Sequence, residues 1–195
     1  ETAHLPSETE VTFLPMEAIG EDGSVNTEGR RELAAVQQGY TYFRDGDVVI
    51  AKITPCFENG KGAVMRGLLG GIGFGTTELI VARPIPSRTS SAFLHWLFVS
   101  PLFRDAATAY MYGAGGQKRV PDDFVRDFVV ALPSLAEQSA IAAFLDQEIG
   151  KLERLTEEAT RAIALLKERR AALISAAVTG KIDVRDAVLA EAAAA

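Results

Sequence analysis

The chain has 195 residues, of which 48% are hydrophobic and 24% charged, and its net charge is −6 at pH 7. This length allows one domain of ordinary size together with a long helix. The negative charge argues against unspecific coating of a polyanion, so a nucleic-acid site would need a local cluster of cations. No window approaches 18 uncharged apolar residues and no secretory signal is visible, so we expect a cytoplasmic protein with no membrane partner.

Residues suited to catalysis or metal binding are few. Cys56 is the single cysteine, which excludes an internal disulfide and fits a reducing compartment. Together with His4 and His95 it supplies too few ligands, at no useful spacing, for a zinc site. Neither histidine lies in a Ser-His-Asp order, and no Asn/Asp-Pro-Pro-Tyr/Phe loop of a methyltransferase is present. We therefore expect no catalytic residue, no metal and no cofactor in this chain.

Short apolar runs separated by turns fill residues 1–133, for which we predict a mixed-sheet α+β domain. A helical pattern covers Ser91–Tyr112, and Pro101 is expected to divide it into two helices. The predicted strands are Val11–Leu14, Val48–Ile53, Ala63–Arg66, Leu79–Ala82 and a closing strand, Phe128–Leu132.

Gly67–Gly75 contains five glycines in nine residues. Such a segment could be a phosphate-binding loop, but no Gly-Lys-Ser/Thr follows it and no helix begins after it. We therefore favour a glycine-rich turn between strands.

A single helical register runs from about Ala136 to Val178. Its apolar residues recur at steps of three and four and form one narrow stripe, as in a coiled coil. Ser134 and Glu137 have the spacing of a capping box, and Gly180 is a natural end. We predict a spacer and dimerisation helix over 134–180, followed by a short tail over 181–195.

The predicted helix cannot bury this stripe against itself, and the rest of the chain offers no second long helix. We therefore expect an antiparallel homodimer. The expected dimerisation residues are Leu145, Ile149, Leu152, Leu155, Ile163, Leu166 and Leu173.

Two polar, glycine-containing loops are candidates for DNA binding. Glutamine pairs with adenine edges, arginine with guanine, and lysine with phosphate. From residue type alone, an ordinary solvated loop is the favoured interpretation of Lys118 and Arg119, and the presence of two polar, glycine-containing loops between strands narrows that difference. The candidate residues are Thr54, Asn59, Lys61, Gln117, Lys118 and Arg119.

Several segments resemble the specificity subunits of type I restriction-modification systems. Their conserved helical region is similar to three segments of this chain: Leu132–Gln138, Ile141–Asp146 and Leu165–Asp183. Their target recognition domain is similar to Tyr42–Asp47, Ala51–Pro55, Glu58–Lys61, Gly73–Glu78 and Gly115–Pro121.

The resemblance implies a DNA-binding subunit without catalytic activity of its own. Such subunits carry two recognition domains held apart by two antiparallel helices, and each domain recognises one half of a split double-stranded DNA sequence. DNA methyltransferase subunits, which bind S-adenosylmethionine, dock on the helices, and a restriction subunit joins the full complex.

This chain departs from that pattern because it has one recognition domain and one helix. It is expected to be either a half-sized subunit that pairs with itself or a C-terminal fragment. The alternative is a coiled-coil assembly adaptor whose globular domain binds a ligand other than DNA, which the net charge of −6 favours slightly.

Overall fold

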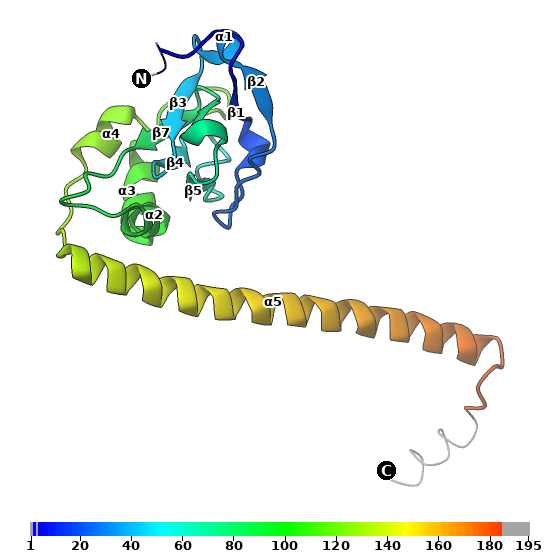
Figure 1. Cartoon of the computed structure of the whole chain (residues 1–195). Helices are drawn as coiled ribbons and strands as arrows, with labels where there is room; N and C mark the ends of the chain where they lie inside the picture. The colour runs from blue at the N-terminus through cyan, green and yellow to red at the C-terminus, as the bar shows by residue number, and fades with distance from the viewer. Residues whose placement is uncertain (1, 3, 185–195) are drawn as a thin grey trace. The chain divides into compact units, whose positions relative to one another are not determined.

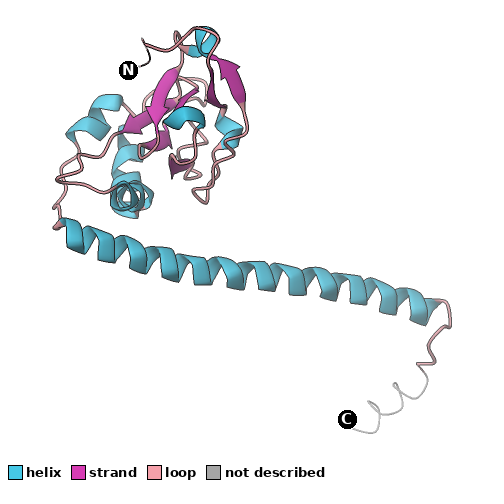
Figure 2. Cartoon of the chain, viewed as in Figure 1, coloured by secondary structure: helices cyan, strands magenta, loops and turns pink. Residues whose placement is uncertain are grey.

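A computed structural model of the chain describes residues 2 and 4–184. Contacts divide the chain into two compact units, Glu1–Leu145, called the globule below, and Asp146–Ala195. Within the described residues, every strand lies in the globule, and the long helix α5 is uninterrupted (Figures 1 and 2). The predicted α+β class is therefore confirmed. The predicted tail, 181–195, lies outside the described residues from residue 185 onward.

The strands of the described residues form two sheets. The first has the order β2-β1-β6-β3, with β1 and β6 parallel and the other pairs antiparallel, and the second is antiparallel with the order β5-β4-β7. The strands are β1 (Glu10–Leu14), β2 (Arg30–Glu32), β3 (Thr41–Arg44), β4 (Val48–Ala51), β5 (Gly62–Val64), β6 (Ile72–Gly75) and β7 (Leu79–Ala82). The helices are η1 (Met16–Ala18), α1 (Leu33–Val36), η2 (Leu69–Gly71), α2 (Ser91–Val99), α3 (Pro101–Tyr110), α4 (Asp122–Asp127) and α5 (Leu135–Val178).

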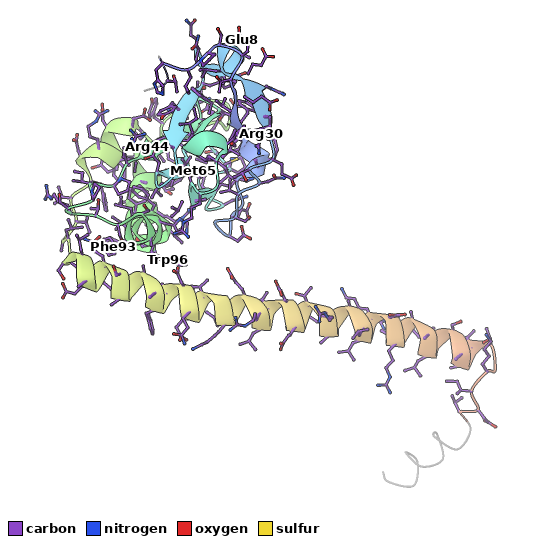
Figure 3. The ribbon with its side chains drawn as sticks, viewed as in Figure 1. Glu8, Arg30, Arg44, Met65, Phe93 and Trp96 are labelled. Atoms are coloured by element: carbon purple, nitrogen blue, oxygen red, sulfur yellow. The ribbon has the colours of Figure 1, made fainter. Side chains whose placement is uncertain are left out.

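Strand β4 is buried on both faces, as its continuous apolar run predicts. Val49 packs into one buried cluster with Phe43 and Met65, and Met65 is labelled in Figure 3. Its neighbours Val48 and Ile50 face a second cluster, formed with the helices α2 and α3. The strand thus joins the sheets to the helices that cover them.

The helical region divides at Pro101, as predicted. Ser100 serves both helices: its Oγ donates to the carbonyl of Leu97 at the end of α2 (2.6 Å) and accepts from the N–H of Phe103 in α3 (3.4 Å). Pro101 occupies the first turn of α3, where a missing N–H costs nothing.

The glycine-rich segment, Gly67–Gly75, contains a strand where the sequence suggested only a turn. Its second half is β6, a central strand between β1 and β3. Gly73 is required there because a Cβ atom would lie 2.5 Å from the Phe43 ring. A contact with Phe43, which is distant in the sequence, thus explains a glycine in a segment whose sequence resembles a loop.

The predicted closing strand, Phe128–Leu132, is wrong. The short helix α4 precedes this segment, and no strand is assigned to it. Phe128 packs on Phe103 with ring centroids 5.2 Å apart, whereas Val129 is 92% exposed. The apolar run therefore contains an aromatic anchor, Phe128, and forms no strand pairing.

Helix α5 begins and ends as its capping signals predict. The N–H and Oγ of Ser134 donate to Glu137 Oε2 at 2.9 and 2.7 Å, which completes the capping box and lowers the pKa of Glu137. At the other end Gly180 adopts a φ of 71°, and the N–H of Lys181 reaches the carbonyl of Ala176 at 2.8 Å. The helix has 44 residues.

Candidate nucleic-acid interface

The structure brings the two predicted loops together through their backbones. The N–H of Thr54 donates to the carbonyl of Lys118, and the N–H of Val120 donates to the carbonyl of Lys52, both at 2.9 Å. Ile53 and Arg119 form an antiparallel bridge between these bonds. Segments more than 50 residues apart in the sequence therefore form one continuous surface next to the C-terminal end of β4.

The polar side chains of the first loop, Thr54–Lys61, are engaged within the globule. Thr54 Oγ1 donates to Glu58 Oε1 at 2.9 Å, and Asn59 Nδ2 donates to Glu21 Oε1 at 2.8 Å. Lys61 Nζ donates to the carbonyls of Met16 and Ile19, at 3.2 and 2.9 Å. A phosphate contact by Lys61 would require its ammonium group to leave these carbonyls.

Arg104 on α3 binds the backbone of the same loop. Its Nη2 donates to the carbonyls of Phe57 and Glu58, and its guanidinium lies 5.0 Å from the centroid of the Phe57 ring. Burial lowers the pKa of Arg104. The loop is thus a fixed support rather than an adaptable one.

The second loop, Gly113–Arg119, has the opposite character. Gly113, Gly115 and Gly116 all have positive φ values, so the loop depends on conformations that other residues rarely adopt. The side chains of Gln117 and Lys118 are exposed, and within the described residues no hydrogen bond engages them. These two side chains are free to contact a ligand.

Arg119 ends this loop and is held by Glu78, which directly precedes β7. Nε donates to both carboxylate oxygens of Glu78 at 3.1 and 2.9 Å, and Nη2 donates to Oε1 at 2.7 Å. The hydrogen bonds from Arg119 lower the pKa of Glu78, and those to Glu78 raise the pKa of Arg119. Both side chains remain partly exposed, at 36% for Arg119 and 27% for Glu78.

Sequence reasoning missed two residues of this surface. Glu78 lies 41 positions from Arg119, and no local pattern links them. Tyr112, which exchanges backbone hydrogen bonds with Arg119, is 64% exposed and could stack on a base. An aromatic residue beside a glycine-rich basic loop is a signal that could have identified Tyr112.

The apolar stripe of α5 is solvent-exposed in the single chain. Leu145 and Ile149 are half-buried, and the remaining five predicted dimerisation residues are more open. Their exposed fractions are 58% for Leu152, 60% for Leu155, 54% for Ile163, 63% for Leu166 and 50% for Leu173.

The part of the chain that the structure describes holds neither a metal site nor a membrane-spanning helix. Across residues 2 and 4–184, no group of three or more His, Cys, Asp or Glu side chains is arranged to hold a metal ion. In the same residues, no helix combines the length and apolarity that a membrane crossing requires.

Comparison with known proteins gives consistent matches. The EcoAI and EcoEI specificity subunits of type I restriction enzymes from Escherichia coli are 42% and 39% identical to the chain over 153 residues, 77% of its length. The chain spans about a quarter (26%) of each of these relatives. No family model matches.

Two solved structures share the fold. The HsdS subunit from Thermoanaerobacter tengcongensis superposes with a TM-score of 0.64 at 22% identity, over 82% of this chain and 42% of that one. A chain from a structure concerned with complex assembly and conformational transition of the type I R-M system gives 0.69 at 22% identity, over 86% and 44%.

Proposed function

We propose that the chain, which is homologous to the specificity subunits of type I restriction enzymes, recognises one half of a bipartite DNA target in the cytoplasm. The observation that carries this proposal is the identity of 39–42% over a match of 153 residues that covers 77% of the chain. Because the match covers more than three quarters of the chain, it includes both loops and the first turns of α5 at whichever residue it begins. In this role the chain contributes binding and no catalytic group.

The second loop is the part of the globule best suited to DNA. In this proposal Lys118 pairs with a phosphate, and Gln117 and Arg119 donate to base edges in the major groove. Thr54, Asn59 and Lys61 fix the first loop, which supports the second through the backbone bond at Thr54. Because the chain carries a net charge of −6, its affinity alone should be weak, and methyltransferase subunits should supply much of the binding.

Helix α5 is proposed as the spacer and docking element. Its exposed stripe would pair antiparallel with a second copy, which places two recognition domains at opposite ends of the pair. DNA methyltransferase subunits, with their S-adenosylmethionine, would dock on this pair, and a restriction subunit would join the full complex.

The test is DNA binding by the complex assembled with its methyltransferase subunits. Lys118→Ala should weaken binding evenly across sequences and reduce the slope of log K against log salt by about one. Gln117→Ala or Arg119→Ala should cost roughly 1–3 kcal/mol on the cognate duplex and relax specificity at one position. Arg66→Ala removes an exposed cation elsewhere on the globule and is the matched control.

If all three variants bind and discriminate as the parent does, the second loop does not contact DNA. The adaptor alternative would then gain weight, because the net charge of −6 suits a ligand other than DNA. An adaptor would also show no salt-dependent retention on a DNA resin.

A further inference from the structure

We propose that Glu78 is a positioning residue that holds Arg119 so that the free edge of its guanidinium recognises a guanine. This inference rests on the proposed function, since it assigns a specific role to one residue of the DNA-binding loop and adds a second residue to the site.

The hydrogen bonds of the pair leave one edge of the guanidinium available. Arginine carries five N–H donors. Glu78 takes the single N–H of Nε and one N–H of Nη2. Within the described residues, no hydrogen bond uses Nη1. Nη1 and the second N–H of Nη2 form the pair of donors that matches the O6 and N7 acceptors of guanine.

Both members of the pair are anchored at their backbones. Arg119 exchanges hydrogen bonds with Tyr112, whose N–H donates at 3.1 Å and whose carbonyl accepts at 2.8 Å. The carbonyl of Glu78 accepts from the N–H of Lys52 at 2.9 Å, where β4 ends. Gln117, by contrast, lies in the glycine-rich part of the loop. Arg119, whose backbone is fixed by hydrogen bonds, is therefore the residue that recognises the base in this proposal.

Holding the side chain in advance favours recognition in two ways. An arginine that is already in one rotamer loses less conformational freedom when it meets a base. The carboxylate also fixes the plane of the guanidinium, and bidentate pairing depends on that plane. The partial exposure of both side chains leaves the free edge accessible from solvent.

The charge of Glu78 makes the proposal distinguishable from simple electrostatics. A carboxylate near DNA repels phosphates, so its removal alone should strengthen binding to every duplex. If Glu78 positions Arg119, its removal should instead weaken binding to the cognate duplex. The same change would leave binding to unrelated DNA equal or stronger. Opposite signs on the two duplexes are the expected signature.

The experiment uses the complex with methyltransferase subunits and three kinds of duplex: cognate, singly substituted at each base pair, and unrelated. Glu78→Gln should lower cognate affinity about 10-fold and abolish discrimination at one G·C pair. Arg119→Ala should abolish discrimination at the same pair, and the double variant should lose nothing further there. Asp122→Asn, which removes a neighbouring exposed carboxylate paired with Lys52, should leave discrimination intact.

The outcomes separate the inference from the proposed function. If Arg119→Ala relaxes specificity and Glu78→Gln does not, Glu78 has no positioning role, although the loop still contacts DNA. If neither variant changes discrimination, both proposals fail. If Glu78→Gln weakens binding to all duplexes equally and lowers the melting temperature, the pair is only structural and the inference is overturned.

Discussion

Gln138 provides the sharpest test of how the first turn of α5 is held within the globule. Its side chain is fully buried, and its three hydrogen bonds all go to backbone groups. Oε1 accepts from the N–H of Ser90 at 2.9 Å, and Nε2 donates to the carbonyls of Arg88 and Pro133 at 2.7 and 2.9 Å. One amide thus ties the first turn of α5 to the segment before α2 and to the residues that precede the helix.

We expect Gln138→Ala to destabilise the globule by about 3 kcal/mol, because a hydrogen bond contributes roughly 1 kcal/mol and three are lost together. For a chain of this size, that loss corresponds to a fall in melting temperature of roughly 10 °C. The matched control is Gln147→Ala in the same helix, where the side chain is exposed. That change should stay within about 0.5 kcal/mol of the parent.

The assay is urea unfolding followed by the fluorescence of Trp96, the single tryptophan, which lies on α2 (Figure 3). Ser90, which binds Gln138, caps the N-terminus of α2, so the fluorescence of Trp96 on the same helix should report the loss of these hydrogen bonds. If Gln138→Ala unfolds at the same urea concentration as the control variant, the three hydrogen bonds do not stabilise the globule, and the reasoning is refuted.

Three further results are expected. Asp47 is 1% exposed and receives two hydrogen bonds of 2.8 Å from Arg83. Asp47→Asn should therefore cost about 2–3 kcal/mol in urea unfolding, and a loss below about 0.5 kcal/mol would contradict that role. Because hydrogen bonds from Arg119 lower the pKa of Glu78 below its ordinary 4.5, the pair stabilises the fold fully above pH 4.5 and weakens as pH falls through the lowered pKa. A carboxyl NMR titration should show this low midpoint in the parent and a higher midpoint in Arg119→Ala; equal midpoints would exclude the pair in solution. Leu155, 60% exposed, should lie in the dimer seam, so Leu155→Lys should convert a dimer to monomer in sedimentation, and an unchanged sedimentation coefficient would place the seam elsewhere.

Local signals predicted some elements well. Strand β4 follows from an uninterrupted apolar run, the division at Pro101 from the geometry of proline, and α5 from its periodicity and caps. Each of these signals lies within a few residues of the structure that it predicts. The same reasoning failed for β6 because the requirement for Gly73 comes from Phe43, 30 positions earlier in the sequence and on a neighbouring strand.

The sequence of the candidate site likewise indicates its local features but not its contacts with residues distant in the sequence. Sequence alone indicates that both loops are polar, but not which of their side chains already have partners. Lys61 is a cation that serves two backbone carbonyls, and Asn59 is bound to a glutamate 38 positions away. Lys118 resembles Lys61 in the sequence, yet no hydrogen bond within the described residues engages its side chain. Folding therefore divides chemically similar residues into those that build the surface and those that remain available to a ligand, and the second loop holds the available ones.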